Sequence, residues 1–309
     1  MPKNSQQNSH PLSASQTQIW LGQHKEHQAP LYNMAYRYAI TGPLEINRFI
    51  AAWNDVAQHN TVLRTRFFET KSGIHQHFDG EPATLAFVDF SNEENPDLSA
   101  ARWINAQVSS NFSLDESLVN TALLKLNDKQ WVWFCCLHHL ITDAFSFQLM
   151  WKELAQRYFS KQPLINEKHN IEANSYSHYL NHELLLRKNI VDNESLLEHW
   201  RNRKTNGSLR LYDIETSNPT TEAIRADQCI SEKHSALHAS MSQLPSARSF
   251  SAELSRFYVW LAVYAIYLFR LSGAENITLF IPVANRGDRR ECQGSVSYTH
   301  LTLPTNREV

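Results

Sequence analysis

The sequence has only four cysteines among 309 residues, and their spacing suits neither a zinc site nor a disulfide framework. Cys135 and Cys136 are adjacent, whereas Cys229 and Cys292 lie far from them and from each other. This usage is typical of a protein in a reducing cytoplasm. The histidines show no metal-ligand grouping either, so no metal site is expected.

A strong charge of either sign is also missing, because 29 Lys and Arg residues stand against 31 Asp and Glu residues. The net charge of −2 gives no general reason to bind nucleic acid or an anionic membrane. The longest hydrophobic run, residues 257–269, is too short to cross a bilayer, and the polar first ten residues contain no signal peptide. Function must therefore be sought in specific sites.

Apolar material is sufficient for a core, since 42% of the residues are hydrophobic and 11% aromatic, and the length suits about two domains. Apolar periodicity predicts helices over 13–23, 45–59, 98–108, 147–158, 176–187, 193–203 and 251–271, the first capped by Ser13 or Ser15. Short apolar runs between turn residues predict strands over 36–40, 63–69, 74–78, 83–88, 119–126, 131–137 and 277–283. The mixture indicates an α/β (α+β) fold.

The most informative segment is HHLITDAFSF at residues 138–147, where a predicted strand ends and a predicted helix follows. Loops between strands and helices commonly display reactive side chains. By residue frequencies, two adjacent histidines with an aspartate at this distance would occur by chance on the order of 0.03 times in such a chain. The alternative interpretation is a pair of strand-end histidines, one satisfied in the core and one solvated.

Four stretches, in the same order, resemble the condensation domains of non-ribosomal peptide synthetases, which belong to the chloramphenicol-acetyltransferase-like superfamily. The family signature His-His-x-x-x-Asp-Gly matches residues 138–144 except that Ala144 replaces the glycine. The other stretches are PLSASQTQIW at 11–20, HNTVLRTRF at 59–67, and the segment 257–286, which closes in IPVANR. The resemblance covers about residues 11–291.

This resemblance implies a two-lobed chloramphenicol-acetyltransferase-like fold, with the catalytic loop between the lobes in a tunnel open at both ends. After a polar leader at 1–10, an N-terminal lobe would occupy 11–159, a linker 160–173 and a partial C-terminal lobe 174–293. The family's second lobe normally continues further, so we expect a fragment with an incomplete second lobe. The tail at 294–309 looks like translated sequencing-adapter sequence and is expected to be non-native.

The implied activity is amide-bond formation between a donor acyl or aminoacyl thioester and an acceptor aminoacyl thioester. Both substrates would be carried on the phosphopantetheine of partner carrier proteins, and the domain itself would bind no cofactor. The donor carrier is expected on a separate chain, because the resemblance begins close to Met1, and the acceptor carrier downstream in the parent chain. The run at 138–147 is also similar to enterobactin-type siderophore synthases, which implies an aryl-capped siderophore product.

The residue roles follow from the same resemblance. His139 either accepts the proton of the attacking amine or holds the amine by a hydrogen bond. Alternation at the strand end turns His138 inward as a supporting residue. Asp143 has the position of a helix cap, whereas the resemblance pairs it with Arg64. Arg66 would share the face of Arg64 if both lay in one strand.

Two further positions bear on the expected substrate channel. The methyl group of Ala144 would crowd a substrate arm at the place where the family has glycine. Ser146 either donates to the thioester carbonyl or caps the following helix. Trp20 and Trp133 are interpreted as core aromatics.

Two other functions are compatible with these residues. A stand-alone acyltransferase of the same superfamily would use coenzyme A in place of carrier proteins, with the same His139. A non-catalytic domain that recruits a partner enzyme is the second alternative. The intact His138, His139 and Asp143 argue against it, whereas Ala144 is compatible with it.

Overall fold

The computed structural model describes residues 9–25, 30–71, 73–160, 176–195, 197–198 and 252–274, together with positions 277, 279 and 281. The chain divides into two compact units, one made of residues 1–193 and 281–309 and the other of residues 194–280. The elements predicted at 160–173, 193–203, 277–283 and 294–309 lie wholly or largely outside the described residues.

A four-stranded sheet with the order β2-β7-β6-β5 forms the centre of the first unit. Its strands are β2 (Asn33–Thr41), β5 (Ala86–Asp89), β6 (Val119–Asn127) and β7 (Gln130–His138). β7 pairs antiparallel with β2 and with β6, whereas β5 runs parallel to β6. The predicted hairpin of β6 and β7 is confirmed, and its second strand leads into the histidine pair.

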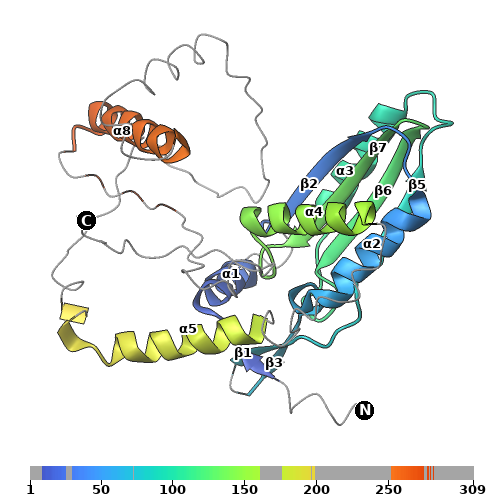
Figure 1. The fold of residues 1–309 in the computed structure, drawn as a ribbon. Helices are drawn as coiled ribbons and strands as arrows, with labels where there is room; N and C mark the ends of the chain where they lie inside the picture. Colours follow the sequence, from blue (N-terminus) through green and yellow to red (C-terminus); the bar gives the residue numbers. More distant parts are fainter. Residues whose placement is uncertain are drawn as a thin grey trace. The chain divides into compact units, whose positions relative to one another are not determined.

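Helices cover both faces of this sheet. α2 (Ile46–His59) and α4 (Ala144–Phe159) pack on one face, and α3 (Pro96–Val108) packs on the other. Figure 1 shows α4 in front of the sheet and α3 behind it. Each of these helices was predicted from its apolar periodicity, and the structure confirms all three.

The side chains of β7 alternate between the two cores. Trp133 and Cys135 belong to the core under α2 and α4, whereas Phe134 and Cys136 belong to the core under α3. Burial raises the pKa of the Cys136 thiol to about 12, so this cysteine is an apolar core residue and no nucleophile. Because both faces are buried, β7 is an almost continuous apolar run that ends in the polar histidine pair.

A second, three-stranded antiparallel sheet has the order β1-β4-β3. It consists of β1 (His10–Pro11), β3 (Arg66–Thr70) and β4 (Gly73–His77). Helix α1 (Ala14–Lys25) follows β1 directly. Ser13 caps α1, because its Oγ accepts from the N–H of Gln16 at 3.1 Å while Gln16 Oε1 accepts from the N–H of Ser13 at 3.0 Å.

The strand predicted over 63–69 begins later than expected. A 3₁₀ helix, η1 (Thr61–Arg64), precedes β3, and the backbone N–H groups of Leu63 and Thr65 donate to carbonyls inside this turn. Val62 and Leu63 are adjacent and both buried. A strand would send them to opposite faces, so the tight turn is what places both in the core.

Of the strand predicted over 83–88, only the part from residue 86 onward forms a strand, β5. Trp53 Nε1 donates to the carbonyl of Ala83 at 2.8 Å, and the side chains of Ala83 and Leu85 are buried. The backbone at Ala83 is therefore held by a tryptophan side chain from α2 and not by a neighbouring strand.

Two later helices were also expected. α5 (Tyr176–Val191) belongs to the first unit, where Tyr176 and Leu180 are buried and Glu183 Oε1 accepts from the N–H of Ala14 at 2.9 Å. α8 (Ala252–Ser272), in the second unit, ends at Gly273 with φ +67°, as the sequence predicted. Among the described residues, no helix is both long enough and apolar enough to span a bilayer.

Candidate functional site

The histidine pair lies at the carboxyl end of β7, in the middle of the main sheet. The N–H of His138 donates to Leu118 O at 3.1 Å, and the N–H of His139 donates to Tyr32 O at 2.8 Å. These bonds tie the start of the loop to the segments on both sides of β7. The loop then runs to Asp143, where α4 begins.

His139 is half-buried, and its Nδ1 lies 2.7 Å from the carbonyl oxygen of Thr142. A carbonyl only accepts hydrogen bonds, so Nδ1 carries the ring proton and donates it. The neutral imidazole then has its lone pair on Nε2. The loop thus selects the tautomer of His139 in which Nε2 is the proton acceptor.

His138 has the opposite environment. Its side chain is only 2% exposed, and its ring lies against the rings of Tyr32 and Phe112. Its Nδ1 accepts from the N–H of Leu140 at 3.1 Å. Burial, with a smaller effect of the neighbouring His139, lowers the pKa of His138 to about 3. His138 is therefore neutral at physiological pH, turned inward as the alternation predicted.

Asp143 caps helix α4. Its Oδ1 accepts from the backbone N–H and from the Oγ of Ser146, each at 2.6 Å, and the residue is almost completely buried. The place of Asp143 in the sequence, shortly before the predicted helix, already indicated this cap. The hydroxyl of Ser146 is a donor to that carboxylate, so Ser146 belongs to the cap as well.

The ion pair expected between Asp143 and Arg64 is absent from the described part of the chain, and Arg66 does not replace it. The guanidinium of Arg66 donates to Thr65 O at 3.0 Å and to the carbonyl of Glu81 at 2.8 Å. The expectation that Arg64 and Arg66 share one face is wrong, because Arg64 ends the 3₁₀ helix and only Arg66 lies in a strand. Alternation does not apply across that junction.

Ala144 is the first residue of α4, and its side chain is exposed, as is that of Phe145. Ser146 and Phe147 turn into the core instead. The position that differs from the family signature thus lies on the accessible side of the loop that carries His139. Among the described residues, no group of three or more His, Cys, Asp or Glu is placed to hold a metal ion.

Two buried glutamines next to this loop were not expected from the sequence. Gln16 Nε2 donates to the carbonyl of Leu140 at 3.1 Å, and the amides of Gln16 and Gln76 form two reciprocal hydrogen bonds of 2.9 Å. For Gln16 a signal existed in the Ser-x-x-Gln spacing of a capping box. For Gln76, a polar residue in a short strand, we find none.

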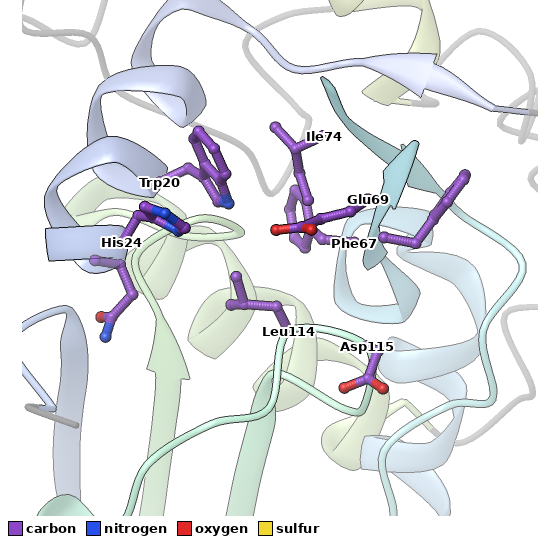
Figure 2. Close-up of a pocket in the computed structure, with 9 residues that line it drawn as sticks. Trp20, His24, Phe67, Glu69, Ile74, Leu114 and Asp115 are labelled. Carbon is purple, nitrogen blue, oxygen red and sulfur yellow. The ribbon is translucent and has the colours of Figure 1, made fainter. Parts of the chain in front are cut away.

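A pocket of about 380 Å³ lies between α1, the β3–β4 hairpin and the segment before β6. Figure 2 shows Trp20, Ile74 and Leu114 around one hollow, with the carboxylate of Glu69 turned toward it. Trp20 is partly buried: it packs against the main core, as expected, and it also lines this pocket. Trp133, in contrast, is fully buried as predicted.

The condensation-domain family model matches residues 6–297, and the chain belongs to this family. The chain is 25% identical over 287 residues to a dimodular nonribosomal peptide synthase of Bacillus subtilis (strain 168). This alignment covers 89% of this chain and 11% of the synthase. It is also 25% identical over 318 residues to a linear gramicidin synthase of Brevibacillus parabrevis, covering 97% of this chain and 6% of the relative.

Solved structures of condensation domains have the same chloramphenicol-acetyltransferase-like fold. A variant of the starter condensation domain of rhizomide synthetase, in complex with C8-CoA, superposes with a TM-score of 0.75 at 25% identity. The match covers 93% of this chain and 63% of that domain. The first condensation domain of the calcium-dependent antibiotic synthetase shares the fold at a TM-score of 0.66 and 18% identity, over 93% of this chain and 67% of that one.

Proposed function

We propose that this condensation domain joins a donor acyl or aminoacyl thioester to the amine of an acceptor aminoacyl thioester in non-ribosomal peptide biosynthesis. The observation that carries the proposal is the hydrogen bond from His139 Nδ1 to Thr142 O, because it leaves the basic lone pair of the ring on Nε2. Membership of the condensation family supplies the reaction class.

In the proposed reaction, the neutral acceptor amine attacks the carbonyl carbon of the donor thioester. A C–N bond forms, the C–S bond breaks, and the proton lost by nitrogen passes to His139 Nε2 and then to the departing thiolate. Free α-amino groups have pKa values of about 7.7–8.0, so part of the amine is already neutral at cellular pH. Holding amine and thioester in attack geometry can contribute about 7–11 kcal/mol, so His139 also serves the reaction by orienting the amine.

The proposed substrates are carried on the phosphopantetheine of a donor carrier protein and an acceptor carrier protein. The rhizomide starter domain in complex with C8-CoA supports this, since coenzyme A ends in the same pantetheine thiol. We further propose an aryl-capped siderophore as the product class, on the similarity of residues 138–147.

The same complex with C8-CoA favours one second candidate, a stand-alone acyltransferase that takes its acyl group from coenzyme A. The two candidates differ in the acceptor. A condensation domain acylates an aminoacyl thioester, whereas the alternative acylates a free small molecule.

The test incubates the chain with C8-CoA or benzoyl-CoA as donor and Leu-SNAC as acceptor, the pairing suggested by a rhizomide-domain complex with C8-CoA and Leu-SNAC. Mass spectrometry should find the acyl-leucyl amide from the parent chain and not from His139→Ala. Acylation of free leucine in preference to Leu-SNAC would favour the coenzyme A alternative. Absence of any His139-dependent amide with both donors would contradict the proposed function.

A further inference from the structure

We propose that Gln16, supported by Gln76, is a positioning residue that holds the catalytic loop at Leu140 and thereby keeps His139 in its reactive tautomer and place. The proposal rests on the proposed function of His139. Its starting point is one hydrogen bond, from Gln16 Nε2 to Leu140 O at 3.1 Å, between two fully buried residues.

The orientation of the two amides is determined by their partners. Gln16 Oε1 accepts from the N–H of Ser13 and from Gln76 Nε2, while Gln76 Nε2 also donates to Pro11 O at 3.0 Å. Rotating either amide by half a turn would bring like groups together. Gln16 Nε2 therefore always faces the loop, with both of its hydrogens used, one on Gln76 and one on Leu140.

Leu140 is the point at which this amide pair meets the histidines. Its N–H donates to His138 Nδ1, and its carbonyl accepts from Gln16. Leu140 directly follows His139 and stands two residues before Thr142, whose carbonyl accepts from His139 Nδ1. A shift of the Leu140 peptide would therefore move both ends of the hydrogen bond that selects the His139 tautomer.

The bond to Leu140 is not needed to form helix α1. The cap of α1 uses Ser13 Oγ and Gln16 Oε1, and a separate bond joins the N–H of Ala14 to Glu183. The side-chain nitrogen of Gln16 takes no part in either. Instead it reaches the catalytic loop, and through Gln76 it links β1, α1 and β4 to the segment that carries His139.

The test uses methionine, which has nearly the shape of glutamine and no amide. Gln16→Met should lower kcat for amide formation about 10–100-fold, because small misplacements of a catalytic group have effects of this size, with KM for Leu-SNAC unchanged. The ¹⁵N spectrum of selectively labelled histidine should show His139 losing its preference for the Nδ1-protonated form. Gln58→Met, the same change at an exposed position of α2, should alter neither.

The double variant Gln16→Met and Gln76→Met separates positioning from plain stability. It removes both buried amides together, so its melting temperature should recover toward the parental value. Its kcat should stay low, because Leu140 O is still not held. Recovery of kcat along with the melting temperature, or near-parental kcat in Gln16→Met, would overturn the proposal. The His139 spectrum needs no substrate, so it decides the positioning claim even if the parent chain forms no amide.

Discussion

His138 and His139 are neighbours in the chain with opposite chemistry, because successive side chains of a strand point to opposite sides. His138 turns between Tyr32 and Phe112, is buried, and has a depressed pKa. His139 stays partly accessible, with its Nδ1 on the carbonyl of Thr142. His138 therefore supports the loop, and His139 is placed to accept a proton.

Replacing His139 by alanine should remove catalysis without unfolding the chain. We expect amide formation to fall about 10²–10⁴-fold, the usual effect of losing an acid–base group, with the melting temperature nearly unchanged. His59→Ala, at an exposed histidine of α2, is the matched control and should keep the parental rate. A single-turnover assay and a thermal melt on each variant provide the comparison. Near-parental turnover by His139→Ala would remove it from the mechanism.

His138 should make the folded state sensitive to mild acid. In the unfolded chain a histidine binds a proton near pH 6.5, whereas folded His138 resists protonation until about pH 3. Below pH 6.5 the unfolded state therefore binds more protons, and the free energy of unfolding should fall by up to about 1.4 kcal/mol per pH unit. Between pH 6.5 and 5 this amounts to about 2 kcal/mol.

His138→Asn is the variant that tests this pH dependence. The asparagine oxygen can still accept from the N–H of Leu140, but the side chain does not titrate. Urea unfolding at pH 6.5 and pH 5 should show a smaller loss of stability in the variant than in the parent. Equal losses would mean that His138 is already protonated, or solvated, in the folded chain.

At the scale of elements, the strand β7, the loop and helix α4 form one continuous unit. β7, an inner strand of the sheet, ends at the histidine pair, the Asp143 cap starts α4, and Phe147 and Met150 bury the first turns of the helix. The cap and the helix packing together define where the loop ends. The position of His139 therefore depends on two elements that pack in the same core.

The cap that Asp143 forms at the start of α4 should contribute to the stability of the folded chain. Asp143→Ala should lower the free energy of unfolding by about 0.5–2 kcal/mol, whereas Asp143→Asn, which keeps a cap oxygen, should cost much less. Breaking a buried ion pair would cost about 3–5 kcal/mol in both variants. Urea unfolding of the two variants distinguishes these cases, and a large loss in Asp143→Asn would restore the pairing with an arginine.

At the scale of the whole molecule, the first unit has two cores separated by the main sheet. Leu154 of α4 lies in one core and Leu124 of β6 in the other, and both are fully buried. The chain spans 63% of the solved rhizomide domain, 11% of the Bacillus synthase and 6% of the gramicidin synthase. In the part of the domain that the chain spans, the position of the histidine pair depends on the central sheet, because the pair lies at the end of β7.

The two-core arrangement predicts additive destabilisation. Leu154→Ala and Leu124→Ala should each lower the free energy of unfolding by about 2–5 kcal/mol, the range for a leucine truncated in a packed core. Since the sheet separates the two sites, the double variant should lose the sum to within about 0.5 kcal/mol. Denaturant unfolding measures all three values. A clearly smaller loss in the double variant would mean that the two cavities relax into each other.

Much of the fold was predictable from local pattern. Helix α2 and the hairpin of β6 and β7 follow from apolar spacing, and the histidine pair was correctly expected between a strand and a helix. The start of β3 was not predictable from local pattern. Val62 and Leu63 are buried together by a 3₁₀ turn, which strand alternation does not describe. The pairing of Asp143 with Arg64 rested on the family resemblance and not on local pattern, and the structure shows Asp143 Oδ1 on Ser146 instead.

The sequence by itself determined the family, the main elements and the strand–loop–helix order that presents His139, since these depend on contiguous motifs and on periodicity along the chain. Only the tertiary structure decided which ring nitrogen of His139 carries the proton and which polar groups meet at Leu140. Gln16 meets Gln76 and Leu140 across 60 and 124 positions of sequence. Local pattern reports which side chains are apolar, but the partners of a buried polar group depend on how distant segments pack.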